Sequence, residues 1–159
     1  MSGIFRRVMT AGLLLAVFVP ALFLASPGVW AALISMIVAL AAHEWARLSR
    51  FPAGISILYA GLMGGIALGL PYLPMAYTLP LYASLLTMAA LFWILIAPLW
   101  LSLRWHGQFF FIRAALGVVI LLPTWVALLY LRERGPWVLL AVLAVVWVAD
   151  TAAFFAGRR

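Results

Sequence analysis

The stretch from Pro136 to Ala156 reads PWVLLAVLAVVWVADTAAFFA and carries a single charged side chain, that of Asp150. A helix rises about 1.5 Å per residue, so about 20 apolar residues cross a hydrocarbon core of about 30 Å. This stretch is long enough, and its continuous apolar character differs from the alternating pattern of a barrel strand. We therefore predict a transmembrane helix.

Further apolar segments precede this stretch, each followed by breaker or charged residues. The predicted spans are 8–25, 29–46, 53–72, 76–100, 109–130 and 136–156. The separators are Ser26-Pro27-Gly28, residues 47–52, Leu73-Pro74, residues 104–108 and residues 132–135. We expect an all-α polytopic transmembrane bundle of about six spans, forming a single domain over residues 1–159.

The composition supports a membrane protein and excludes several other classes. Hydrophobic residues make up 69% of the 159 residues and charged residues 8%, against about 25% charged in soluble domains. The net charge of +7 comes from arginines scattered in ones and twos, so no basic face indicates nucleic-acid binding. The absence of cysteine excludes disulfides, thiolate catalysis and cysteine-based zinc sites.

The arginines also predict an orientation, because positive charge favours the cytoplasmic ends of spans. With a cytoplasmic N-terminus, most arginines fall on that side, and only Arg132 and Arg134 fall outside. Both chain ends are then cytoplasmic. The first segment resembles a signal peptide, but Phe23-Leu24-Ala25 lacks the small residue that cleavage requires, so we interpret it as a retained span.

Glycines and aromatic residues suggest how the spans pack and end. Gly61, Gly65 and Gly69 are spaced by four residues, which predicts close helix packing on one face; the alternative is a substrate groove there. Aromatic residues near the predicted span ends are interpreted as interfacial anchors: Trp30, Trp45, Tyr72, Tyr77, Trp100, Trp105, Tyr130 and Trp137.

Asp150 is the most informative polar residue. An aspartate at a span centre costs about 2.5–3.5 kcal/mol on insertion scales, and no basic residue lies within four positions of Asp150. An isolated carboxylate in a span is by default a candidate functional residue. Its possible roles are metal binding, proton relay or pairing with an arginine of another helix.

His43 and Glu44 lie at the predicted cytoplasmic end of the second span. Glu44 could pair with Arg47 or Arg50 in an interfacial polar collar, or could be a supporting carboxylate in the same cytoplasmic pocket as Asp150. Two histidines and three acids in the whole chain argue against a multi-ligand metal cage within it. No Walker loop, dinucleotide turn or G-x-S-x-G elbow occurs.

The segment from Trp147 to Arg159, WVADTAAFFAGRR, closely resembles a segment of the bacterial phosphatidate cytidylyltransferases, the CDP-diacylglycerol synthases. The resemblance extends to Ser26-Pro27-Gly28-Val29-Trp30 and to Glu44-Trp45-Ala46-Arg47-Leu48. Members of that family continue past the position of Arg159 with a polar loop, further spans and a polar C-terminal signature. We therefore expect this chain to be the N-terminal part of such an enzyme, truncated and inactive alone.

The resemblance implies a nucleotidyltransferase of phospholipid biosynthesis in the inner membrane, with CTP and phosphatidic acid as substrates. It implies Mg²⁺ held by Asp150, with Arg158 and Arg159 contacting substrate phosphate or, alternatively, anchoring the span. No catalytic residue is assigned. Arg47 and Arg50 could attract anionic lipid, and a homodimer is a further possible assembly. The alternative function is a non-catalytic membrane protein or transporter subunit that uses Asp150 as an ion or proton site.

Overall fold

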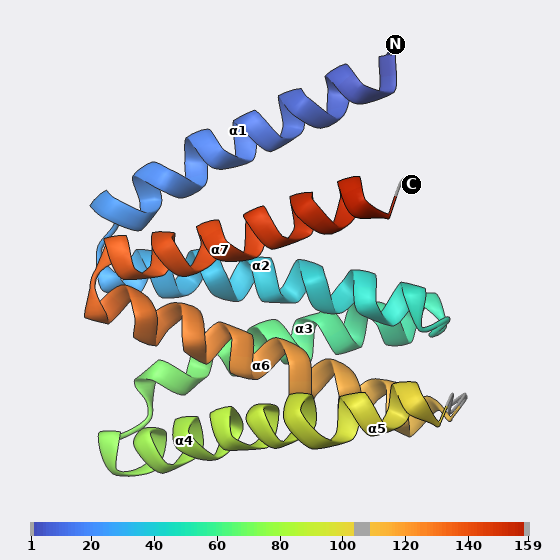
Figure 1. The fold of residues 1–159 in the computed structure, drawn as a ribbon. Coiled ribbons are helices and arrows are strands. Elements are labelled where there is room, and N and C mark those ends of the chain that lie inside the picture. The colour runs from blue at the N-terminus through green and yellow to red at the C-terminus, as the bar shows by residue number, and fades with distance from the viewer. Residues whose placement is uncertain (1, 104–108, 158–159) are drawn as a thin grey trace. The chain divides into compact units, whose positions relative to one another are not determined.

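A computed structural model describes residues 2–103 and 109–157 of the chain. The described residues are almost entirely helical and contain no strand (Figure 1). The helices are α1 (Ser2–Leu24), α2 (Pro27–Leu48), α3 (Ala53–Gly69), α4 (Met75–Leu91), α5 (Ala97–Ser102), α6 (Phe110–Arg134) and α7 (Pro136–Ala156). The 3₁₀ helix η1 (Leu70–Tyr72) extends α3, and the π-helical turn η2 (Phe92–Ile96) joins α4 to α5. The predicted all-α fold is confirmed.

Several described helices are long and apolar enough to cross a membrane. They are Pro27–Leu48, Ala53–Tyr72, Met75–Ser102, Phe110–Arg134 and Pro136–Ala156, which correspond to the last five predicted spans. In α1, the apolar stretch found among the described residues is Leu15–Leu24, which is shorter than a span. The chain is a multi-pass membrane protein, and the first predicted span stays a prediction.

Two predicted separators are helical instead. Pro27 and Gly28 form the first turn of α2, where proline is favoured because its missing N–H needs no partner. The backbone N–H of Trp30 donates to the Ser26 carbonyl at 2.9 Å. Residues 132–134 form the last turn of α6, where arginines complement the helix dipole. That helix ends at Arg134, and the next residue is Gly135, whose φ of 149° favours glycine.

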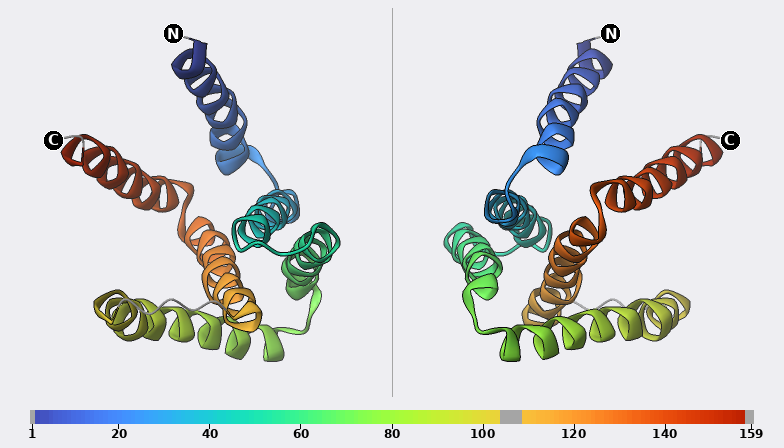
Figure 2. Two further views of the ribbon diagram at one scale, coloured as in Figure 1. Left: turned by 90° about the vertical axis from the view of Figure 1, so that its right-hand side faces the viewer. Right: turned by 90° about the vertical axis from the view of Figure 1, so that its left-hand side faces the viewer.

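The chain divides into two compact units, each with its own contacts. We call Ala31–Leu128 the central unit, and Met1–Trp30 with Leu129–Arg159 the terminal unit. In the central unit, α2 and α3 lie side by side (Figures 1 and 2). The buried face of α2 repeats every four residues, at Ile34, Val38, Ala42 and Ala46, which is the spacing of one helix face.

Close packing of α2 on α3 occurs at Gly64, and the prediction for the other glycines was wrong. A Cβ atom added to Gly64 would lie 2.7 Å from the Cβ of Ala39. No atom lies within 4 Å of a Cβ added to Gly61, Gly65 or Gly69. Gly64 does not belong to the predicted series Gly61, Gly65 and Gly69, whose members are four residues apart. The face of α3 that contacts α2 is therefore rotated about the helix axis from the predicted face. Gly61 and Gly65 instead line a groove, described below.

The end of α2 is closed by a Schellman motif. The N–H of Phe51 donates to the Ala46 carbonyl and the N–H of Arg50 donates to the Arg47 carbonyl, each at 2.9 Å. Arg50 has a φ of 60°, in the left-handed region that glycine adopts most easily. Phe51 is buried behind the turn, as the hydrophobic contact of this motif requires.

In the terminal unit, Arg132 of α6 binds the end of α1. Its Nε donates to the Leu22 carbonyl at 3.0 Å, and its Nη2 donates to the Ala25 carbonyl. Its guanidinium carbon lies 5.0 Å from the centre of the Trp30 ring. Trp30 is 1% exposed, so it is a packing residue and not the predicted interfacial anchor. The arginine satisfies carbonyls that the helix end leaves without partners.

Candidate functional site

Asp150 lies in α7, six residues before the helix ends at Ala156, a depth of about 9 Å along the axis. Its side chain is exposed, and among the described residues none forms an ion pair or hydrogen bond with its carboxylate. The adjacent Thr151 hydroxyl donates to the Trp147 carbonyl at 2.7 Å, so it is engaged within the helix. The carboxylate is therefore available to a cation or a donor.

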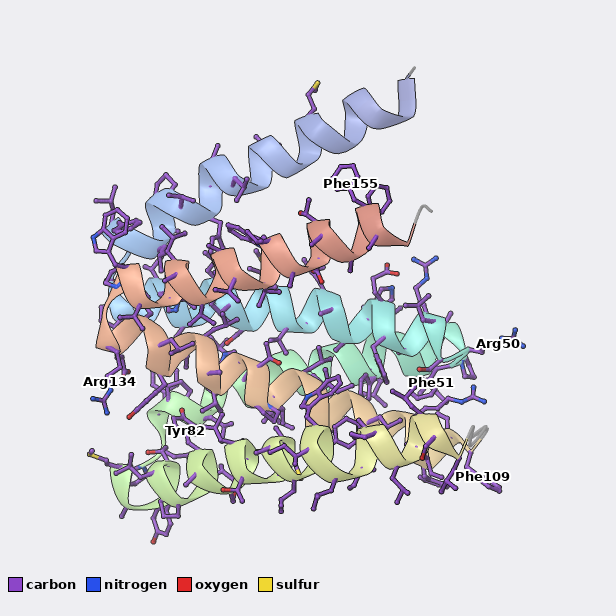
Figure 3. All side chains as sticks on the ribbon, viewed as in Figure 1. Arg50, Phe51, Tyr82, Phe109, Arg134 and Phe155 are labelled. Atoms are coloured by element: carbon purple, nitrogen blue, oxygen red, sulfur yellow. The ribbon has the colours of Figure 1, made fainter. Side chains whose placement is uncertain are left out.

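The surroundings of Asp150 on α7 are apolar. Trp147, Val148, Phe154 and Phe155 all have exposed side chains, and Phe155 projects from the last turn of the helix (Figure 3). Placing a carboxylate without a partner in such surroundings is unfavourable in a membrane. A ligand or a residue outside the described contacts is needed to compensate its charge.

Glu44 forms an ion pair with Arg47 on the same helix, with 3.1 Å between Oε1 and Nη1. Both side chains are about 60% exposed, so the pair contributes little to stability. Of the two interpretations of Glu44, the pairing with Arg47 is confirmed. Glu44 and Asp150 belong to different units, and a shared role for the two carboxylates stays a prediction.

The acids and histidines of the described residues do not form a cluster of three that could hold a metal ion. Magnesium, however, commonly takes one or two carboxylates and completes its shell with substrate phosphates and water. Asp150 fits that pattern as a single protein ligand, because its carboxylate is exposed and not engaged. Arg158 and Arg159, the predicted phosphate contacts, lie outside the described residues, as does the loop 104–108.

Two hollows lie between α2 and α3 in the central unit. The larger has a volume of about 550 Å³ and includes Ala39, Gly61 and Gly65 in its lining. The smaller has a volume of about 480 Å³ and lies at the Arg47 end of α2. His43 lines both. The alternative interpretation of the glycine face, as a groove, therefore describes Gly61 and Gly65 better than close helix packing does.

A junction of α2, α3 and α6 fixes the helices around these hollows. The indole Nε1 of Trp45 donates to the Arg113 carbonyl at 2.9 Å, and the Tyr59 hydroxyl donates to the Ala114 carbonyl at 2.8 Å. A Cβ atom on Gly117 would lie 2.7 Å from Cδ1 of Trp45 and would also meet the Tyr59 hydroxyl. Only glycine at 117 permits both contacts.

A second contact between distant parts of the chain holds α6 against α2. The buried Nε1 of Trp125 donates to the Ser35 hydroxyl at 3.0 Å, and Ser35 donates to the Ala31 carbonyl at 2.8 Å. The Trp125 ring also packs edge-on against Tyr82 of α4, with 5.8 Å between ring centres. Sequence reasoning missed Trp125 and Gly117, because a tryptophan and a glycine within an apolar run carry no signal of a particular partner.

Fold and site define a multi-pass helical membrane protein with a lone accessible carboxylate near the end of its last described helix. Residues 5–159 match the model of the cytidylyltransferase family. The chain is 30% identical over 161 aligned positions to a phosphatidate cytidylyltransferase of Pseudomonas aeruginosa. The match covers 96% of this chain and 57% of that relative. No solved structure matches the chain.

The chain belongs to the cytidylyltransferase family, since the family model covers nearly all of it. The resemblance first drawn from the segment 147–159 is thus confirmed over a much longer region. Asp150 and Glu44 both lie within the matched residues.

Proposed function

We propose that the protein containing this chain transfers a cytidylyl group from CTP to phosphatidic acid, forming CDP-diacylglycerol and pyrophosphate. The observation that carries the proposal is the match over residues 5–159 to the cytidylyltransferase family, joined to the name of the Pseudomonas relative. Because the chain spans 57% of that relative, the activity is proposed for the whole protein.

In the proposed reaction, a phosphate oxygen of phosphatidic acid attacks the α-phosphorus of CTP. The bond from that phosphorus to the bridging oxygen breaks, and pyrophosphate leaves with the bonding electrons. Bound Mg²⁺ would neutralise the charge that builds on the phosphate oxygens. The Asp150 carboxylate would bind the ion directly or through water, and arginines near the same membrane surface would orient the phosphates.

The membrane setting suits this chemistry, because one substrate is a lipid and the other is water-soluble. Asp150 lies about 9 Å along the helix from the end of α7, close enough to a membrane surface for both substrates to reach it. We propose that this surface is the cytoplasmic face of the inner membrane, with both ends of the chain on that side. The arginine distribution supports this orientation.

The test is an assay of the complete protein in liposomes that contain phosphatidic acid. CTP radiolabelled at the α-phosphate should yield labelled lipid, whereas CTP labelled at the γ-phosphate should not, because the γ-phosphate leaves in pyrophosphate. Omission of phosphatidic acid should abolish the product. If no lipid is labelled and the liposomes instead show a proton or ion flux that requires Asp150, the protein is the alternative, an ion-translocating subunit.

A further inference from the structure

The two hollows between α2 and α3 adjoin each other along the helix pair. We call the larger one the tail groove; its lining includes the small residues Ala32, Ala39, Ala60, Gly61 and Gly65. We call the smaller one the head hollow; it is lined by His43, Arg47, Phe51, Ala53, Ser56 and Ile57. His43 and Ile57 line both, so a single ligand could extend from one into the other.

The tail groove is apolar and open on one side. Met36 and Leu40 of α2 and Leu68 of α3 form part of its lining and are themselves largely exposed. Gly61 and Gly65 have open space where a side chain would lie. A flexible hydrocarbon chain can enter such an open groove from the lipid phase.

The head hollow lies at the positively charged end of α2. Arg47 lines it, and Arg50 projects from the turn that follows the helix (Figure 3). The Nη1 atom of Arg113 donates to the Ser49 carbonyl at 2.7 Å, which adds a third guanidinium at this end. The acid on this part of α2 is Glu44, which pairs with Arg47. One carboxylate thus faces three guanidinium groups, and this end of α2 carries an excess of positive charge. An anionic group fits this charge.

The backbone conformation of Arg50 is a separate indication of a ligand site at this end of α2. Its φ of 60° is one that a glycine would adopt without cost. Arg50 immediately precedes Phe51, which lines the head hollow. Strained positions of this kind are concentrated at ligand sites.

The length of the two hollows matches one lipid molecule. Each wall runs sixteen residues, from Ala53 to Leu68 along α3 and from Arg47 to Ala32 along α2, which is about 22 Å of helix. Half the thickness of a bilayer, from headgroup to midplane, is about 20–22 Å. The two hollows together are therefore about as long as one lipid molecule, and their charged end lies toward the end of α2 at Leu48.

We propose that the helix pair α2–α3 binds phosphatidic acid, with the phosphate in the head hollow and one acyl chain in the tail groove. This inference rests on the proposed function, because it assigns the lipid substrate a place on this chain. The open side of the groove admits the lipid from within the membrane. A second copy of the chain would leave the cationic head hollow without a counter-charge, and a zwitterionic lipid would compensate it less well.

The test uses the complete protein in liposomes with phosphatidic acid that carries a photoactivatable diazirine midway along one acyl chain. After illumination, the labelled residues are mapped by mass spectrometry. We expect label within 32–43 of α2 and 57–68 of α3, and competition by unlabelled phosphatidic acid but not by phosphatidylcholine. Replacing Arg50 with glutamine should reduce this preference for phosphatidic acid.

A matched pair of glycine variants controls for folding. Gly65→Leu fills the tail groove, whereas Gly69→Leu adds the same side chain outside its lining; both positions have open space for it. Gly65→Leu should reduce labelling of α2 and α3 about fivefold, the loss expected for one good packing contact in a membrane. Gly69→Leu should leave labelling unchanged.

Label spread evenly over the exposed faces of the helices, or labelling equal for phosphatidylcholine, would overturn the inference. Cross-linking of two copies through these residues, in place of lipid label, would also overturn it in favour of a dimer contact. Labelling requires neither CTP nor turnover. Loss of cytidylyl transfer with intact labelling therefore counts against the proposed function alone, and transfer without labelling counts against the groove alone.

Discussion

Gly64 of α3 lies so close to Ala39 of α2 that a methyl group on the glycine would be 2.7 Å from the alanine Cβ. Ordinary contacts between carbon atoms are about 3.5–4.0 Å, so any side chain at 64 must push the two helices apart. Since α2 and α3 form the walls of the tail groove, this contact also sets the width of the groove.

Replacing Gly64 with alanine should therefore destabilise the protein by about 1–3 kcal/mol, the usual cost of overpacking a close contact. Gly65→Ala is the matched control, because the neighbouring glycine has open space and alanine favours the helix. Thermal unfolding in detergent measures both. Equal melting temperatures for the two variants would contradict the close approach at Gly64.

Gly117→Ala should destabilise the junction of α2, α3 and α6, because the new methyl group would meet Trp45 and Tyr59. The expected cost is again about 1–3 kcal/mol. In a Tyr59→Phe background the same change should cost less, since the hydroxyl it would meet is gone. A double-mutant cycle on melting temperature detects this coupling, and strictly additive effects would show that the contact is absent.

Arg132→Gln should loosen the end of α1, because the arginine donates hydrogen bonds to the carbonyls of Leu22 and Ala25. Hydrogen bonds from charged groups contribute about 1.5–3 kcal/mol. Hydrogen exchange should rise across residues 22–30. Arg134→Gln is the control, since Arg134 is exposed and contacts Tyr130 on its own helix; an equal rise in that variant would refute a specific role for Arg132.

Arg50→Gly should stabilise the end of α2 by about 1–2 kcal/mol, the cost of the left-handed conformation for a residue with a Cβ atom. The same change should weaken the preference for phosphatidic acid in the labelling experiment. A more stable protein with a poorer lipid preference would indicate that the arginine is kept for binding. A variant that is less stable than the wild type would show that Arg50 makes a structural contact instead.

The spans could be predicted from the sequence to within about four residues, because apolar length and helix geometry determine them almost alone. Five of the predicted spans match long apolar helices of the described chain. The helical turns at Pro27 and at residues 132–134 were missed, because proline and arginine are typical both of loops and of particular helix ends.

The candidate site was predicted only in part. Asp150 is identifiable because a carboxylate in an apolar run has a high cost whatever surrounds it. The contact at Gly64 was not predictable, because nothing in the sequence distinguishes Gly64 from Gly61 and Gly65. Only in the structure is Gly64 the one of these three that lies against Ala39. The hollows beside His43 likewise depend on how α2 packs on α3, a relationship that no residue pattern within one helix contains.

The central claim, that Asp150 acts in cytidylyl transfer, is tested most directly by the activity of the complete protein with Asp150→Asn over a range of magnesium concentrations. Asparagine keeps the size of the side chain and removes its charge. We predict a loss of at least about 100-fold in turnover, comparable to the loss of one electrostatic stabiliser of a charged transition state, with insertion and folding intact. Glu133→Gln, a change of an exposed acid elsewhere, should keep its activity. Near-normal activity of Asp150→Asn at ordinary magnesium concentrations would contradict the account and leave Asp150 as a structural residue.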